Sequence, residues 1–97
     1  MPSRPYEIMF LVQPSADEER LGAINERVQN AITTLGGSVE KVNPPVRRRL
    51  AYELGRHREG QYGVIEFQLP PERSRELDRT IRLTEDLLRY LVVRRDE

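Results

Sequence analysis

The chain has 97 residues, of which 37% are hydrophobic and 33% charged, and its formal net charge is zero at pH 7. This length indicates one domain over residues 1–97 with a modest core, because a chain of about 100 residues buries roughly two-thirds of its unfolded surface. The lack of cysteine excludes disulfides and thiolate metal sites. No apolar run approaches the roughly 20 residues that span a bilayer, and no signal peptide begins the chain, so we expect a cytoplasmic protein.

The first predicted elements are a strand over residues 6–13 and the helix that follows it. Apolar, β-favouring residues fill the strand segment, which a proline ends. Ser15 and Glu18 have the spacing of a capping box with Ser15 as the N-cap. Apolar residues then recur at steps of three and four, which predicts one buried stripe on a helix that the glycine pair 36–37 ends. The stripe consists of Leu21, Ile24, Val28, Ile32 and Leu35.

Three further strands and a second helix are predicted in the rest of the chain. In order, they are a second strand from 39 to 42, interrupted at 43–45 and resumed from Val46, a basic turn at 55–60, a third strand at 61–69, a helix from Pro71 to about Leu83, and a last strand at 87–94. The resulting order, β-α-β-β-α-β, is typical of the ferredoxin-like α+β fold. That fold has a four-stranded antiparallel sheet with two helices on one face.

With both helices on one side, the other face of the predicted sheet has no cover from this chain. Side chains alternate along a strand, so the two faces can be separated. The larger apolar sets are assigned to the core: Tyr6, Ile8, Phe10 and Val12, then Gly63, Ile65, Phe67 and Leu69, and finally Tyr90 and Val92. The opposite face still carries Met9, Leu11, Tyr62, Val64, Leu91 and Val93, where an antiparallel sheet normally presents polar residues.

A contiguous apolar patch of this kind on a small domain indicates an interface. We expect these six residues to contact another protein. Self-association is one alternative, and surface aliphatic residues without a role are another.

Arginine supplies fifteen of the sixteen positive charges, and five arginines lie within residues 47–58 against one acid, Glu53. Such a cluster favours contact with phosphates, and a solvated charge run on an edge strand is the alternative. The only histidine, His57, lies in this segment without a nearby acid for general-base catalysis. No glycine-rich phosphate loop is present. The sequence therefore predicts no enzyme, no cofactor, no metal site, and neither a membrane nor a small molecule as partner.

Two other classes of protein share the predicted element order. Residues 60–67 partly imitate the octamer of single-strand RNA-binding domains of the RNA-recognition-motif type. Those domains stack bases on aromatic platforms, but here Val64 replaces one platform, and the first strand offers Met9 and Leu11 instead of a ring. A ferredoxin-like enzyme or small-molecule sensor is the other alternative, and it requires a converging polar site that the sequence does not supply.

Several short segments carry a likeness to a known family. They are Arg4-Pro5-Tyr6-Glu7, Arg48-Arg49-Leu50-Ala51-Tyr52, Gly60 with Tyr62, and the passage from Ile81-Arg82-Leu83 through Arg89 to Leu91-Val92-Val93-Arg94. With these segments the chain resembles the ribosomal protein S6 family of the bacterial small subunit over essentially its whole length. Where that family follows the tyrosine of the second segment with proline, this chain has Glu53.

The resemblance implies a structural protein of the small ribosomal subunit with a ferredoxin-like fold. It implies that the protein joins ribosomal protein S18 and then binds the central domain of 16S ribosomal RNA. By this resemblance the RNA-binding residues are Arg4, Tyr6, Arg48, Arg49, Arg82 and Arg89. A basic partner would explain how a net-neutral protein lies on RNA. It would also explain why an apolar face with two acids, Glu7 and Glu66, is left open.

Overall fold

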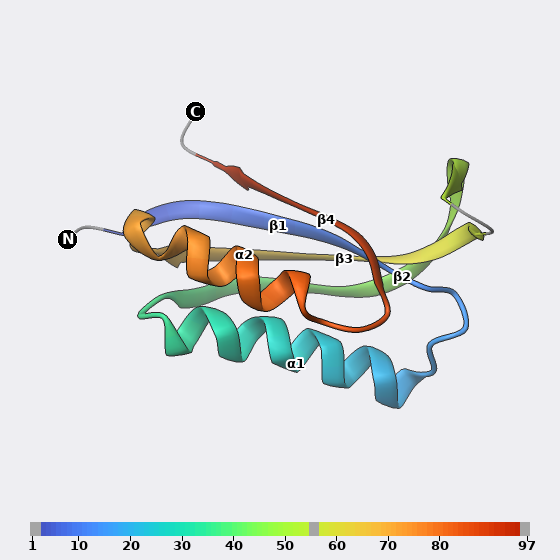
Figure 1. Ribbon diagram of the computed structural model, residues 1–97, viewed down its shortest axis with the longest axis horizontal. Coiled ribbons are helices and arrows are strands. Elements are labelled where there is room, and N and C mark those ends of the chain that lie inside the picture. The colour runs from blue at the N-terminus through green and yellow to red at the C-terminus, as the bar shows by residue number, and fades with distance from the viewer. Residues whose placement is uncertain (1–2, 55–56, 96–97) are drawn as a thin grey trace.

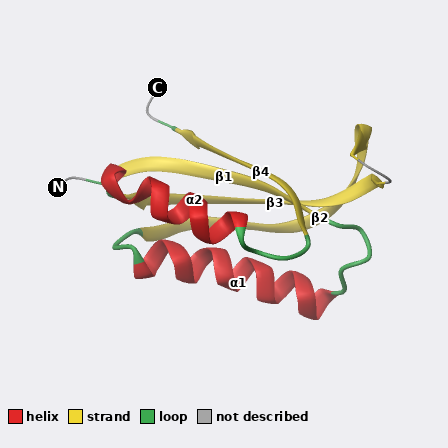
Figure 2. Ribbon diagram, in the orientation of Figure 1, coloured by secondary structure: helices red, strands yellow, loops and turns green. Residues whose placement is uncertain are grey.

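The computed structural model describes the backbone of residues 3–54 and 57–95, and their side chains apart from residues 44, 46–54 and 57–59. The elements are β1 (Arg4–Val12), α1 (Glu18–Thr34), β2 (Ser38–Leu54), β3 (His57–Leu69), the 3-10 helix η1 (Pro71–Arg73), α2 (Ser74–Arg82) and β4 (Leu87–Arg94). The strands form one antiparallel sheet in the order β2-β3-β1-β4, and both helices lie on the same face (Figures 1 and 2). The predicted ferredoxin-like α+β architecture is confirmed.

The core lies between the sheet and the two helices, and one face of each element supplies it. Its buried residues are Tyr6, Ile8, Phe10, Val12, Ile24, Val28, Ile32, Ile65, Phe67, Leu69, Leu77 and Ile81. The rings of Tyr6 and Phe67 stack with their centroids 5.6 Å apart. Tyr90 and Val92 pack against this cluster from β4 and are partly buried. The predicted inward-facing sets of the first, third and last strands are therefore confirmed.

The N-terminus of α1 differs from the sequence prediction, because Asp17 and not Ser15 is the N-cap. Asp17 has an extended backbone, with φ −82° and ψ 177°, and its carboxylate accepts a 2.8 Å hydrogen bond from the backbone N–H of Arg20. Ser15 belongs to the preceding turn, in which the N–H of Ala16 donates to the carbonyl oxygen of Gln13 at 3.2 Å. The predicted capping box is wrong because this turn delays the start of the helix.

The predicted end of α1 at the glycine pair is confirmed. Gly36 has a φ of +86°, and its N–H donates to the carbonyl oxygen of Thr33, while the N–H of Gly37 donates to that of Ile32. This is the Schellman arrangement, which satisfies the last carbonyl groups of a helix. A Cβ atom at Gly37 would lie 2.4 Å from the carbonyl oxygen of Gln68, so only glycine allows the chain to pass this close to β3.

The β2–β3 hairpin is longer than predicted. β3 begins at His57, which pairs with Leu54, so most of the predicted basic turn at 55–60 is strand; residues 55 and 56 lie outside the described residues. The predicted interruption of the second strand is also wrong, since β2 runs through the prolines and shifts its register between Asn43 and Val46. β2 is an edge strand, where a bulge tolerates residues that lack an N–H group.

Candidate interface on the open face of the sheet

The open face, meaning the face of the sheet opposite to α1 and α2, carries alternate residues of the four strands. The register aligns them in rows that cross the sheet. Along the strands, the successive rows are Lys41, Glu66, Glu7 and Val93, then Asn43, Val64, Met9 and Leu91, then Tyr62, Leu11 and Arg89. The open face therefore changes from charged to apolar along the strand direction.

The apolar half of the open face holds a shallow groove of about 180 Å³. Its lining residues are Met9, Leu11, Tyr62, Arg89, Tyr90 and Leu91. Leu91 is 54% exposed and Val93 is 40% exposed, although both are large apolar residues. The structure thus brings together four of the six residues expected to contact a protein partner. Val64 is paired with Met9, and Val93 is paired with Glu7, one row away from the groove.

Leu11 departs from the expected exposure of this face. It is only 1% exposed, yet it is not part of the core cluster between the sheet and the helices. Gly60 covers it, since a Cβ atom at Gly60 would lie 2.3 Å from Cδ1 of Leu11. Strand alternation assigns Leu11 to the correct face but does not reveal that the backbone of β3 approaches it. Leu11 therefore contributes the floor of the groove and not a protruding contact.

Three of the arginines expected to bind RNA have described side chains. Arg4 is exposed at the start of β1, and Arg89 is exposed on the open face of β4. Arg82 is exposed at the end of α2, in the helical layer, where its Nη2 lies 2.6 Å from the Asp78 carboxylate. Its pKa is raised, first by a hydrogen bond to Tyr90 and then by the charge of Asp78. Arg82 and Arg89 therefore lie in different layers of the structure.

The remaining residues expected to bind RNA are Tyr6, Arg48 and Arg49. Tyr6 is 8% exposed and its ring is stacked on Phe67 in the core, so little of the ring is available to a base. Arg48 and Arg49 belong to β2, paired with the backbone of β3, and their side chains lie outside the described residues.

The charged half of the open face is organised by Arg95, which follows β4. Its Nε donates to the carbonyl oxygen of Tyr6 at 2.9 Å, and its Nη1 donates to the Glu66 carboxylate at 3.4 Å. Its Nη2 donates to the carbonyl oxygen of Phe67 at 3.3 Å and to the carboxylate of Glu40. One guanidinium group therefore connects the end of β4 with β1, β3 and β2.

Glu40 receives a second hydrogen bond, from Nε2 of Gln68 at 3.1 Å. The bonds from Arg95 and Gln68 lower the pKa of the Glu40 carboxyl, with Arg95 the larger cause. The sequence does not point to this site. Val39 and Val42 both pack against the core, so alternation alone cannot assign the two residues between them. A bulge in β2 resolves this by turning Glu40 onto the open face beside Lys41.

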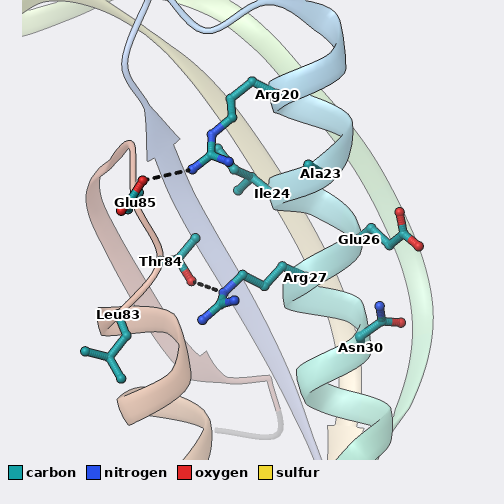
Figure 3. Close-up of a pocket in the computed structure, with 9 residues that line it drawn as sticks. All are labelled: Arg20, Ala23, Ile24, Glu26, Arg27, Asn30, Leu83, Thr84 and Glu85. Carbon is teal, nitrogen blue, oxygen red and sulfur yellow. Dashed lines mark hydrogen bonds and ion pairs between the residues drawn. The ribbon is translucent and has the colours of Figure 1, made fainter.

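A larger groove, of about 680 Å³, lies in the helical layer between α1 and the turn that follows α2 (Figure 3). In it Arg20 pairs with Glu85 at 3.8 Å, and Nε of Arg27 donates to Oγ1 of Thr84 at 3.0 Å. Leu83 is 70% exposed at its edge. The polar groups of this groove fasten the α2–β4 turn to α1, which is a structural role.

Among the residues with described side chains, no three His, Cys, Asp or Glu lie close enough together to hold a metal ion. In the same part of the chain, no helix is long and apolar enough to cross a membrane. The open face instead combines an apolar groove, exposed arginine and a network of carboxylates.

Comparison with known proteins points to one family. The family model described as Ribosomal protein S6 matches residues 5–94. The small ribosomal subunit protein bS6 of Carboxydothermus hydrogenoformans is 39% identical over 94 residues, which cover 97% of this chain and 98% of that protein. The protein of the same name from Mycolicibacterium paratuberculosis is 46% identical over 94 residues, again 97% of this chain and 98% of that protein.

The solved structures agree with the sequence comparisons. The crystal structure of 30S ribosomal protein S6 from Thermotoga maritima matches with a TM-score of 0.91 and 34% identity, and the match covers 97% of this chain and 89% of that chain. The resemblance seen in the sequence is confirmed, and so is the expectation of a small-subunit ribosomal protein that is structural and not enzymatic. The chain belongs to the ribosomal protein S6 family.

Proposed function

We propose that this protein, as one ferredoxin-like domain over residues 1–97, docks ribosomal protein S18 on its open face and binds the central domain of 16S ribosomal RNA together with it. Its place is the ribosome in the cytoplasm. The observation that carries the proposal is the groove on the open face, with Leu91 54% exposed and Val93 40% exposed beside it. A sheet face that combines uncovered apolar side chains with carboxylates suits a partner that is both apolar and basic.

The charge of the chain explains why a partner is needed for RNA binding. Sixteen basic residues are balanced by sixteen acidic ones, and affinity for RNA depends mainly on how many phosphates a protein neutralises. Arg4, Arg82 and Arg89 are exposed, and Arg82 and Arg89 lie in different layers, so these two contribute phosphate contacts without forming one basic patch. A basic partner on the open face adds the missing positive charge next to Arg89.

The proposed contacts follow from these placements. The partner contacts Met9, Tyr62, Val64, Leu91 and Val93, with Leu11 as the groove floor. RNA contacts Arg4, Arg82 and Arg89 together with Arg48 and Arg49. Tyr6 contributes indirectly, because its buried ring stacks on Phe67 and so fixes the position of the start of β1, which carries Arg4.

Filter binding of a 16S central-domain RNA fragment across a range of salt concentrations tests this function. The chain alone should bind weakly, and an equimolar addition of S18 should increase the affinity strongly. The combined complex should also show a steeper dependence of affinity on salt, because more phosphates are neutralised. S18 alone and an unrelated RNA of equal length are the controls. Tight binding of short single strands by the chain alone would instead support a domain of the RNA-recognition-motif type, and no effect of S18 would reject the proposal.

A further inference from the structure

We propose that the charged end of the open face is a guanidinium site for an arginine of the docked protein, and that Arg95 occupies this site in the free protein and leaves it on docking. The site consists of the carboxylates of Glu40 and Glu66 and the carbonyl oxygens of Tyr6 and Phe67. This inference rests on the proposed function, which supplies the basic partner. Beyond that function, it specifies that the partner contributes an arginine at this site and that Arg95 competes with it.

The geometry of the acceptors selects a guanidinium group. Each of the three side-chain nitrogens of Arg95 has an acceptor: Nε has a carbonyl oxygen of β1, Nη1 a carboxylate of β3, and Nη2 both a carbonyl oxygen of β3 and the Glu40 carboxylate. A planar fork with fixed donor directions reaches all of these at once, whereas the compact ammonium group of lysine does not. The arrangement therefore favours arginine over lysine in the partner.

The charges around the site favour a second cation. Among the described residues on this part of the open face, three carboxylates, those of Glu7, Glu40 and Glu66, face two cations, Lys41 and Arg95. Glu7 is paired with Glu66 across β1 and β3, and like charges in directly opposite positions destabilise a sheet. Glu7 makes no ion pair with any described residue. A basic partner would relieve this local excess of negative charge.

Arg95 can leave the site without leaving a buried charge behind. The side chains of Arg95, Glu40 and Glu66 are 27%, 44% and 26% exposed, so water reaches all three groups. Ion pairs in contact with water contribute little to stability. The carbonyl groups that Arg95 contacts belong to Tyr6 and Phe67, which are paired with each other in the β1–β3 ladder. Exchange of one guanidinium for another gives these carbonyl oxygens and carboxylates the same kind of donor as before.

The site is continuous with the apolar groove. The row of Glu66 and Glu7 is adjacent to the row of Val64 and Met9, and rows on one face of a sheet are about 7 Å apart. Side chains two to four residues apart on one extended segment span such a distance. One stretch of the partner can place an apolar side chain in the groove and an arginine in the site.

The competition is tested by calorimetric titration of S18 into the full chain. Arg95→Ala should bind about three- to tenfold more tightly than the native chain, because the affinity of a site rises with the fraction of molecules in which it is free. Glu66→Gln should bind more weakly. Arg75→Ala, at an exposed arginine of α2 on the other face, is the matched control and should leave the affinity unchanged. If the native chain binds S18 and Arg95→Ala binds equally or more weakly, the inference is rejected while the proposed function stands.

A second measurement tests the guanidinium site without S18, so its result does not depend on whether S18 binds this protein. Nα-acetyl-arginine amide is titrated into the isotope-labelled Arg95→Ala chain, and the backbone amide signals of Glu40 and Glu66 are followed by NMR. Saturable shifts are expected at millimolar probe, smaller shifts in the native chain, and none in the double variant Arg95→Ala/Glu66→Gln. Nα-acetyl-lysine amide should bind more weakly. The absence of a saturable response in Arg95→Ala overturns the guanidinium site.

Discussion

Gly63 lies on β3 against the ring of Phe10, and the contact leaves no room for a side chain. A Cβ atom at this position would lie 2.5 Å from Cζ of Phe10, which is itself 1% exposed and enclosed by the core. Overpacking of a close-packed interior costs about 1–3 kcal/mol. We therefore expect Gly63→Ala to lower the free energy of unfolding by about that amount in denaturant titrations.

Gly22 provides the matched control, since a Cβ atom there meets nothing within 4 Å. It is exposed on α1, where alanine is favoured over glycine by about 0.5–1 kcal/mol, so Gly22→Ala should raise the free energy of unfolding. If Gly63→Ala proved as stable as the native chain, the Phe10 ring would have to move freely, which contradicts the packing described above.

The Glu40 carboxyl makes the stability of the fold depend on pH. Hydrogen bonds from Arg95, and then from Gln68, favour its charged form and lower its pKa. Because the folded-state pKa is the lower one, these contacts stabilise the fold above the ordinary glutamate pKa, and the effect is lost as the pH falls through the lowered value. An NMR titration of the Glu40 side chain should give a midpoint below that of an ordinary exposed glutamate. Arg95→Ala should raise that midpoint, and an unchanged midpoint would show that Arg95 is not its main partner.

At the scale of elements, the start of α1 depends on Asp17. Its carboxylate satisfies the N–H of Arg20, one of the N–H groups that have no partner within the helix. Asp17→Ala should lower the free energy of unfolding by about 0.5–2 kcal/mol, measured by thermal or chemical denaturation. Ser15→Ala should change it by less than about 0.5 kcal/mol, because Ser15 lies in the turn before the cap. A larger loss at Ser15 than at Asp17 would restore the capping box that the sequence suggests.

The sequence predicts correctly those elements that depend on residues close together in the chain, such as α1 and its end. The stripe of α1 repeats at the helical period, and the hydrogen bonds of the glycine pair that ends it are local. The hairpin of β2 and β3 is different, because its register depends on pairing across strands. The sequence shows the prolines at 44 and 45 but not the bulge that absorbs them, and it shows Leu11 but not the approach of Gly60 that covers it.

At the scale of the whole molecule, the element order predicts an open face, because the ferredoxin-like topology places both helices on one side of the sheet, and strand parity assigns residues to that face. Parity did not predict the network around Arg95, which joins residues as distant in the chain as Tyr6 and Glu66. The six residues expected to bind RNA follow from the resemblance to a family, which carries no information on where their side chains lie. The fold places Arg82 in the helical layer and Arg89 on the open face, and it encloses the ring of Tyr6.

Two exposed leucines on opposite layers allow the docking surface to be located. Leu91 lines the groove on the open face and is 54% exposed, whereas Leu83 is 70% exposed beside the helical groove (Figure 3). Each is changed to alanine and not to aspartate, because a new carboxylate would itself attract a basic partner. Both variants should keep the native stability within about 0.5 kcal/mol, since neither side chain is in the core.

Leu91→Ala should weaken binding of S18 about tenfold, as expected for a central apolar contact of an interface. Leu83→Ala should leave the affinity unchanged, because Leu83 lies in the helical layer, away from the groove of the open face where we propose that the partner docks. The comparison is independent of stability, since both variants lose the same atoms from exposed positions. A loss at Leu83 without one at Leu91 would move the partner to the helical layer, and the uncovered face of the sheet would then need another explanation.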